Sequence, residues 1–272
     1  MNRALLVGIN AYPGAPLRGC ANDITDMTKL LVDKVGFQVS DIRLLVDERA
    51  STQEIKSRIE WLILGLKEGD RVLFHYSGHG AQYADRNNSG DVSALHDVIC
   101  PVDFDWSQEK MITDSDFKKM FAAIPKGVEF NWISDSCHSG DLAKALIGAR
   151  PEPGEGYRVP RLFPTPADMQ WRIDTALSKG MRAVGLAVEH LYGALVAGCK
   201  SDETSADAFV EGRYNGALTY ALIKQLAAAD GMRTALSSTL PRVQSILTAR
   251  GFTQHPQLRG EPLIIEKPFL AA

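Results

Sequence analysis

A cysteine and a histidine, each following a predicted strand, are the residues of this sequence best suited to carry out chemistry. Cys137 follows the apolar run 128–133, and His79 follows the run 70–77, 58 residues earlier in the chain. Small residues flank both side chains, so a substrate could approach them closely. If the two strands are parallel neighbours, both side chains emerge at the carboxyl edge of one sheet, where α/β proteins place their sites. A thiol beside an imidazole then supplies a nucleophile and a general acid or base.

Main-chain groups near the same two residues complete this hypothesis. The N–H groups of Gly80 and Cys137 could face a substrate carbonyl oxygen as it becomes an oxyanion. Other readings stay open, because Cys137 could be an inert buried thiol. His75 and His79 have a spacing that binds metal on a helix, although here they fall on a strand and the turn beyond it. His138 is adjacent to the thiol, but neighbouring side chains on an extended segment point apart.

The length and composition of the chain are those of an ordinary globular protein. The 272 residues allow one large α/β domain or two small ones, and 45% hydrophobic residues supply a sizeable core. The net charge of −3 provides no basic field for nucleic acid or an anionic membrane. No apolar run is long enough for a membrane span or a signal peptide, so we expect a cytoplasmic protein. Four scattered cysteines without a CxxC pair argue against a zinc site or a disulfide framework: Cys20, Cys100, Cys137 and Cys199.

Strands and helices alternate along the chain. Apolar runs predict strands at 3–9, 42–46, 70–77, 128–133 and 192–199, with a shorter one at 98–102. Helical periodicity predicts helices at about 24–35, 51–66, 113–123, 173–191, 217–229 and 240–249, and a capping box at Ser51 opens the second. Polar or proline-rich stretches predict loops at 84–97, 148–166 and 200–214. This alternation predicts an α/β fold with a mostly parallel sheet of about six to eight strands flanked by helices.

Two motifs resemble those of the caspase-like cysteine peptidases, specifically the metacaspase branch with its bacterial orthocaspase relatives. They are F-H-Y-S-G-H-G at 74–80 and D-S-C-H-S-G at 135–140. The resemblance extends to L-R-G-C-A-N-D at 17–23, D-V-I-C-P-V-D-F at 97–104 and Q-H-P-Q-L-R-G at 254–260. The Q-A-C-x-G signature of true caspases is missing. The resemblance implies one caspase-like peptidase domain over 1–272, with a large-subunit-like part at about 1–147, a flexible linker at about 148–172 and a small-subunit-like part at about 173–272.

The resemblance also implies cleavage of peptide bonds after Arg or Lys, not after Asp. The family's specificity pocket maps onto Cys20, Asp23, Ser77 and Asp135. Two carboxylates at the base of a slot would pair with an ammonium or a guanidinium group, and a guanidinium can be held in a bidentate manner. Asp135 precedes Cys137 by two residues, so on a strand they share a face. Read alone, Asp23 would be a carboxylate at a helix N-terminus, and Asp202 and Glu203 add a weaker candidate acidic rim.

Calcium is the one cofactor that the resemblance raises, because many metacaspases bind it through aspartates outside the active site. Asp97 matches one such position. Asp114 and Asp116 stand where the family often has a run of acids, and Ser115 interrupts that run. Lys144 stands where the family has a further aspartate. Calcium needs about six to eight oxygen ligands, so a lysine in place of an aspartate weighs against calcium binding. We predict that no cofactor is required and keep calcium as the alternative.

The proline-rich part of the linker, 148–166, carries three arginines, Arg150, Arg158 and Arg161, which would suit a chain that cuts itself there after a basic residue. The alternative is a solvated loop with ordinary basic residues. For the whole chain we predict a cysteine endopeptidase acting on protein or peptide substrates, with Cys137 as nucleophile and His79 handling the proton. A catalytically idle or partner-gated interaction module is the alternative, and no motif supports a nucleotide- or acyl-handling enzyme. We expect a monomer, as the resemblance implies, without nucleic-acid or membrane partners.

Overall fold

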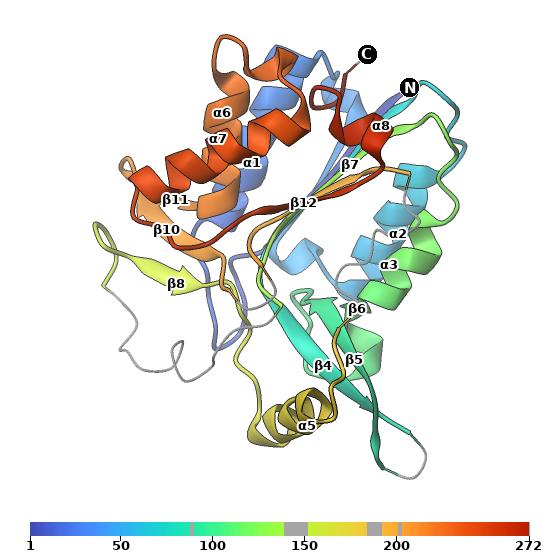
Figure 1. Ribbon diagram of the computed structural model, residues 1–272, viewed down its shortest axis with the longest axis vertical. Helices are drawn as coiled ribbons and strands as arrows, with labels where there is room; N and C mark the ends of the chain where they lie inside the picture. The colour runs from blue at the N-terminus through green and yellow to red at the C-terminus, as the bar shows by residue number, and fades with distance from the viewer. Residues whose placement is uncertain (88–89, 139–151, 184–191, 201–202, 272) are drawn as a thin grey trace.

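The computed structural model describes residues 1–87, 90–138, 152–183, 192–200 and 203–271 (Figure 1). At its centre is a six-stranded sheet in the order β12-β9-β7-β3-β1-β2. Its strands are β1 (Asn2–Gly8), β2 (Ile42–Val46), β3 (Arg71–Ser77), β7 (Glu129–Asp135), β9 (Ala194–Ala197) and β12 (Gln257–Gly260). Neighbouring strands run parallel except β12, which is antiparallel to β9. The predicted mostly parallel α/β sheet is confirmed.

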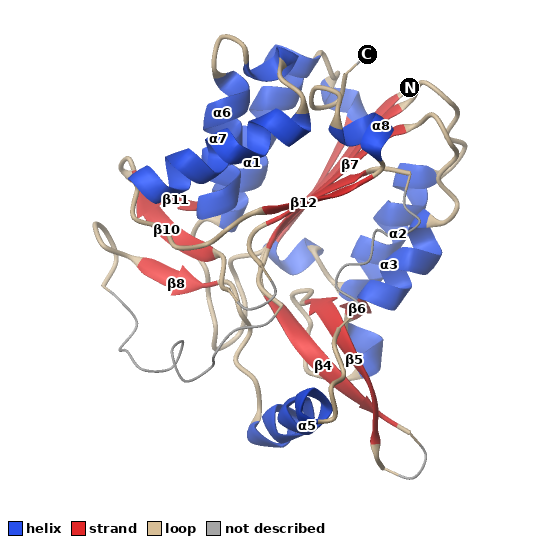
Figure 2. Ribbon diagram, viewed as in Figure 1, coloured by secondary structure: helices blue, strands red, loops and turns tan. Residues whose placement is uncertain are grey.

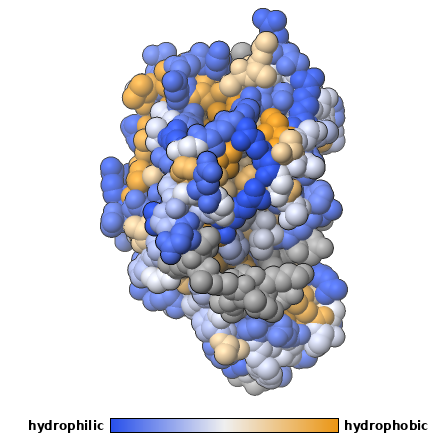
Figure 3. All heavy atoms as spheres, turned by 90° about the vertical axis from the view of Figure 1, so that its left-hand side faces the viewer, coloured by the Kyte–Doolittle hydropathy of each residue, from blue (hydrophilic) through white to orange (hydrophobic). Residues whose placement is uncertain are grey.

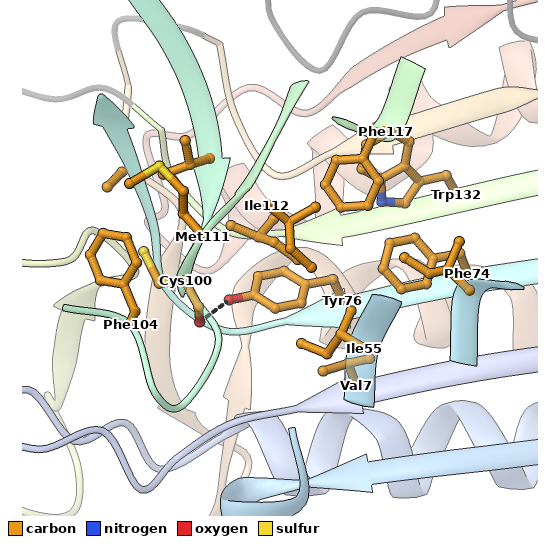
Figure 4. Packing of buried hydrophobic residues seen from close by; sticks show 14 of the residues in the cluster. Val7, Ile55, Phe74, Tyr76, Cys100, Phe104, Met111, Ile112, Phe117 and Trp132 are labelled. Atoms are coloured by element: carbon orange, nitrogen blue, oxygen red, sulfur yellow. Dashed lines mark hydrogen bonds between the residues drawn. The ribbon is translucent and has the colours of Figure 1, made fainter. Parts of the chain in front are cut away.

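Helices cover both faces of this sheet (Figure 2). One layer contains α1 (Cys20–Leu30), α6 (Ala217–Ala227) and α7 (Leu236–Ala249), and the other contains α2 (Thr52–Ile63) and α3 (Asp114–Phe121). Toward α3, Phe117 packs against Phe74 at a ring-centroid distance of 5.8 Å and against Trp132 at 4.6 Å (Figure 4). On the opposite face, Leu73 and Ile133 join the core of the first layer. Because both faces are buried, the central strands have apolar residues on both sides of the sheet.

A hairpin stands where the sequence predicts a loop at 84–97, so that prediction is wrong. β4 (Gly80–Arg86) and β5 (Val92–Ile99) pair antiparallel, and β6 (Ile112–Thr113) extends this sheet. Polar residues of this stretch are interspersed with buried apolar ones such as Ala84 and Leu95, without the strict alternation that marks a half-buried strand in a sequence. α5 (Ala167–Ser178) lies on the hairpin through Met169, whose sulfur accepts the N–H of Ala84 at 3.4 Å.

A second small sheet forms from segments predicted as loops. β8 (Arg158–Pro160), β10 (Ala206–Val210) and β11 (Arg213–Gly216) pair antiparallel in the order β11-β10-β8. These strands are too short to show a readable periodicity. Val159 of the linker pairs with Asp207, so the small sheet holds the middle of the linker beside β10.

The remaining element ends follow local signals with a few differences. Ser51 caps α2 as predicted, accepting the N–H of Glu54 at 3.3 Å. α1 continues as a π-helical turn (Leu31–Val35), and the chain leaves it at Gly36 with φ 82°. α5 begins before the predicted helix at 173–191, of which residues 184–191 lie outside the described part. The short helices are Val39–Asp41, Asp47–Arg49, Gln108–Lys110, Gly231–Arg233 and α8 (Pro262–Ile265).

The surface is mixed in polarity. Hydrophilic side chains dominate the face that Figure 3 shows, with apolar residues visible between them in its upper half. None of the helices in the described ranges combines the length and the apolar character that crossing a membrane requires. Both ends of the described chain lie near Arg71, whose N–H donates to the carbonyl of Met1 at 3.0 Å and whose Nη1 donates to the carbonyl of Leu270 at 3.3 Å.

Candidate active site

The carboxyl ends of β3 and β7 lie side by side at one edge of the central sheet. The two strands are parallel neighbours, and Ser77 pairs with Asp135 at their ends. His79 and Cys137 each stand two residues beyond these paired ends. Both therefore leave the sheet at the same edge, where parallel sheets place their chemistry.

A stretch of the chain itself lies across this edge. The carbonyl oxygen of Arg161 accepts hydrogen bonds from the N–H groups of Gly80 at 3.0 Å and Cys137 at 3.2 Å. The N–H of Arg161 donates to the carbonyl of Ser205 at 2.9 Å, and the N–H of Phe163 donates to the carbonyl of Gly80 at 2.9 Å. An extended peptide thus runs beside Gly80 with two N–H donors on one carbonyl oxygen, the arrangement that stabilises a developing oxyanion.

The tautomer of His79 follows from its contact with a main-chain carbonyl. Its Nε2 lies 2.8 Å from the carbonyl oxygen of Ala15. A carbonyl oxygen only accepts hydrogen bonds, so Nε2 carries the proton and Nδ1 keeps a lone pair. The imidazole packs against the rings of Tyr12 and Phe163, at centroid distances of 4.7 and 5.6 Å. These contacts fix the plane of the ring and direct Nε2–H toward the Ala15 carbonyl.

The thiol of Cys137 is buried against main-chain groups of Ser205. The N–H of Ser205 donates to Sγ at 2.6 Å, and Sγ lies 3.1 Å from the Ser205 carbonyl oxygen. The pKa of Cys199 is raised well above its ordinary value, mainly by a hydrogen bond with Cys137 and secondly by burial. Cys199 is therefore a protonated neighbour of the site. His138 turns away toward the hairpin, with Nδ1 3.1 Å from the carbonyl of Val98.

The guanidinium of Arg161 is fully buried among three carboxylates and a hydroxyl, which we call the acidic pocket. Its Nη2 lies 2.8 Å from Asp23 and 2.9 Å from Asp207. Its Nη1 lies 3.4 Å from Asp135 and donates to the hydroxyl of Ser77 at 2.7 Å. One arginine of the linker therefore has its carbonyl at the strand edge and its side chain in this pocket.

Further hydrogen bonds hold the carboxylate of Asp135 in place. It accepts from the hydroxyl of Ser205 at 2.7 Å and from the N–H and hydroxyl of Thr219, both at 2.8 Å. His75 contacts the same Thr219 hydroxyl at 3.3 Å, and burial lowers the pKa of His75 to about 4. This histidine is neutral near pH 7 and lies behind the pocket.

A glycine makes the wall of the pocket. The N–H of Gly216 donates to Asp23 at 2.9 Å. A Cβ at Gly216 would overlap the Asp135 carboxylate and come within 2.6 Å of the Arg161 Cζ atom. The fourth pocket residue from the sequence, Cys20, is buried beside these groups, and burial raises its pKa well above the ordinary value. It contributes a neutral thiol.

The charges of the pocket are unbalanced in favour of a cation. Burial raises the pKa of Asp23 to about 6; Arg161 opposes the rise, and the neighbouring Asp135 adds to it. Burial alone would lower the pKa of Arg161, but the surrounding carboxylates, led by Asp135, hold it well above its ordinary value. Three acids around one guanidinium make a site that favours a positively charged side chain.

Sequence reasoning missed two contributors, Asp207 and Ser205, which lie in or beside β10. The only available signal was an aspartate inside an otherwise apolar run. Asp202, proposed for the acidic rim, lies outside the described residues. Glu203 does not reach the pocket contacts, because its carboxylate accepts from the N–H of His255 at 2.7 Å and contacts its ring at 2.6 Å.

The other two linker arginines differ from Arg161. Arg150 lies outside the described part of the chain. Arg158 is exposed, and its guanidinium donates to the main-chain carbonyls of Gly251 and Arg250, each at 2.7 Å. Of the linker arginines that the structure describes, Arg161 is the one in the acidic pocket.

The aspartates considered for calcium are engaged in local contacts. Asp97 accepts from the Gln82 amide at 3.2 Å, and burial raises the pKa of Asp97. Asp114 pairs with Nδ1 of His96 at 2.9 Å. Asp116 caps its own helix, α3. Among the residues with described positions, no three His, Cys, Asp or Glu side chains gather as candidate metal ligands.

Comparison with known proteins places the chain in a family. The sequence profile described as "Metacaspase, peptidase C14 domain" matches residues 2–145. Metacaspase-1 of Scheffersomyces stipitis is 32% identical over 94% of this chain and 70% of its own length. Metacaspase-9 of Arabidopsis thaliana is 30% identical over 94% and 92%, and Metacaspase-7 of the same plant is 40% identical over 54% and 37%.

A solved structure supports the fold. The crystal structure of a Geobacter sulfurreducens protein aligns with 100% of this chain and 98% of its own, with a TM-score of 0.69 at 22% identity. The matched family profile spans both strand ends and includes His79 and Cys137. This chain therefore belongs to the metacaspase family of caspase-like cysteine peptidases.

Proposed function

We propose that this protein is a cysteine endopeptidase that cuts after Arg or Lys, and that the bond between Arg161 and Leu162 is one of its substrates. One observation carries the proposal. The Arg161 carbonyl oxygen accepts the N–H groups of Gly80 and Cys137 while its guanidinium fills the acidic pocket. A peptide substrate with the same placement would present its carbonyl carbon beside the thiol.

The proposed reaction follows from this placement. The Cys137 sulfur attacks the carbonyl carbon, and the carbonyl π electrons move to the oxygen, which Gly80 and Cys137 N–H groups stabilise. Nδ1 of His79 takes the thiol proton and returns it to the leaving amine as the C–N bond breaks. Water then hydrolyses the thioester. The Ala15 carbonyl holds Nε2–H throughout and stabilises the imidazolium that forms.

The acidic pocket supports a preference for Arg, with Lys second. A guanidinium presents several N–H groups in one plane, which suits the contacts with Asp23, Asp207 and Ser77. A lysine ammonium is compact and would satisfy fewer of these acceptors. An aspartate would add a fourth negative charge to a buried site, which Coulomb repulsion opposes.

Self-cleavage tests both parts of the proposal. The purified full-length chain is followed by gel and mass spectrometry, beside Cys137→Ala, Arg161→Gln, Arg161→Lys and the matched control Arg158→Gln. We expect cleavage after residue 161 in the wild type and in the Arg158 variant, slower cleavage in Arg161→Lys, and none in the other two. Arg161→Lys keeps the positive charge, so it guards against a folding defect in Arg161→Gln.

Other outcomes would sink parts of the proposal. Cleavage elsewhere, or cleavage that survives Cys137→Ala, would overturn the assignment of the bond or of the nucleophile. An intact chain that still hydrolyses acetyl-Val-Pro-Arg-aminomethylcoumarin would remove self-cleavage and keep the peptidase. No hydrolysis, together with no labelling of Cys137 by iodoacetamide, would favour the idle interaction module. We also propose a calcium-independent monomer in the cytoplasm, which gel filtration, chelators and cell fractionation can check.

A further inference from the structure

Phe163 sits in a cluster of aromatic rings next to the candidate active site. Its ring lies 5.0 Å from Phe104, 5.9 Å from Tyr12 and 6.4 Å from Trp106, measured between centroids. It also meets the His79 ring at 5.6 Å and 90°. All four contacts have edge-to-face geometry, which aromatic pairs prefer. The catalytic histidine candidate is thus one wall of the same cluster.

The main chain fixes how far this cluster lies from the reacting bond. Leu162 forms a parallel bridge with Gly80, and Phe163 donates to the Gly80 carbonyl at 2.9 Å. If the bond after Arg161 is the one cut, Phe163 is the second residue on the leaving side. The bridge to Gly80 would place any substrate's second leaving-side residue at the same point, because Gly80 also supplies an oxyanion donor.

We propose that Tyr12, Phe104 and Trp106 form a specificity subsite that binds an aromatic side chain at the second substrate residue after the cleaved bond. This inference rests on the proposed peptidase function and deepens it. The occupant is identified by Phe163, which the chain itself seats there.

Tyr12 is a rigid wall. Its hydroxyl donates to the carbonyl of Cys100 at 2.9 Å, contacts the hydroxyl of Tyr76 at 3.0 Å and accepts the N–H of His79 at 3.0 Å. A ring held in this way cannot swing aside, so the subsite has a fixed width. A side chain that fills it also packs against the imidazole and keeps that ring in place.

Trp106 is held in an unusual backbone conformation. Its φ is 70°, a left-handed value that bulky residues rarely adopt. Asp105 closes the turn around it by accepting the N–H and hydroxyl of Ser107, at 3.0 and 2.5 Å, and by pairing with Lys110 at 2.9 Å. Strained residues of this kind persist where the surrounding structure enforces them, and they concentrate at ligand sites. In this conformation the indole lies 5.0 Å from the Phe104 ring and 6.4 Å from the Phe163 ring, measured between centroids.

The test uses internally quenched peptides that copy residues 157–167 and differ only at the position of Phe163, which carries Phe, Leu or Ala. For the wild-type enzyme we expect kcat/KM to be about tenfold higher with Phe than with Ala, the scale on which apolar pockets discriminate. Trp106→Ala should reduce this ratio to below about threefold. The matched control is Trp171→Ala, which removes an indole that is 61% exposed on α5 and should keep the wild-type ratio.

The ratio of kcat/KM for the Phe peptide to that for the Ala peptide is measured on one enzyme preparation. It is therefore unaffected by differences between variants in the folded fraction, in the reactivity of Cys137 and His79, or in competition from the enzyme's own 160–163 segment. A wild-type ratio near one, with acetyl-Val-Pro-Arg-aminomethylcoumarin still hydrolysed, overturns the subsite and leaves the peptidase proposal standing. A ratio that survives both Trp106→Ala and Phe104→Ala also overturns it, because the preference would then arise elsewhere. Failure to cut any peptide or the coumarin amide would count against the proposed function itself.

Discussion

Replacing Asp135 by asparagine tests the acidic pocket with little change in shape. The amide can keep the hydrogen bonds of the carboxylate, with its oxygen accepting from Thr219 and its NH₂ group donating to the Ser205 hydroxyl. What disappears is one charge 3.4 Å from the guanidinium, worth about 5 kcal/mol at an effective dielectric of about 20. Breaking one partner of a buried pair costs about 3–5 kcal/mol in measured cases. Two other carboxylates remain, so we take the lower figure, and about 3 kcal/mol corresponds to a loss of roughly 100-fold.

The assay is kcat/KM for acetyl-Val-Pro-Arg-aminomethylcoumarin, which copies residues 159–161, measured beside the rate of self-cleavage. Both should fall by about 100-fold in Asp135→Asn, while alkylation of Cys137 by iodoacetamide reports whether the thiol site is intact. The control is Asp168→Asn, which removes a carboxylate that is 67% exposed on α5 and paired only with Arg172 in the described structure. It should stay within about twofold, since exposed pairs contribute little. If Asp135→Asn cut arginyl peptides within threefold of the wild type, this carboxylate would not be the recognition group.

Three further predictions follow from the pocket and the aspartates considered for calcium. Burial raises the pKa of Asp23 to about 6 and Arg161 opposes that rise, so the pKa of Asp23 is higher when the pocket is empty, and binding a cation releases a proton. Competitive inhibition by benzamidine should therefore weaken by up to about tenfold per pH unit as pH falls toward about 6, and level off below that. An inhibition constant that does not change with pH would contradict this. Gly216→Ala should lower kcat/KM for arginyl peptides by at least about tenfold and for lysyl peptides by less, because the added methyl group would meet the Arg161 Cζ atom; equal losses would show a general defect. Peptide hydrolysis in millimolar calcium and in chelator should agree within about twofold, and a loss beyond about tenfold in chelator would restore the calcium alternative.

Buried central strands were the easiest elements to predict. β1, β3 and β7 lie in the middle of a sheet covered on both faces, so nearly every residue is buried and each strand has large apolar residues that mark it in the sequence. The hairpin β4–β5 and the small sheet were missed because their strands are short or half polar, and single-sequence patterns do not separate such strands from loops. Tertiary packing, for example of α5 on the hairpin, decides their structure.

The residues of the candidate site also fall into those that the sequence predicted and those that it did not. Asp23 and Asp135 came from motifs next to predicted elements, and the strand register brings them together with Ser77. Asp207 comes from β10, a strand that no pattern indicated, and no sequence signal distinguishes Arg161 from Arg158. Which arginine enters a pocket depends on how β8 pairs with β10, and that register exists only in the folded chain.

The pairing of β8 with β10 determines what a cut after Arg161 would accomplish. β8 ends directly before Arg161, and Arg158 is fixed to the carbonyls of Arg250 and Gly251. A new carboxyl terminus would therefore stay beside the pocket as a tethered product, at an effective concentration on the order of millimolar. Cleavage of the chain and departure of the Arg161 side chain from the acidic pocket would then be separate steps with separate rates. Hydrolysis of other substrates should then lag behind the disappearance of the intact chain, and the length of that lag reports how fast β8 leaves its neighbour.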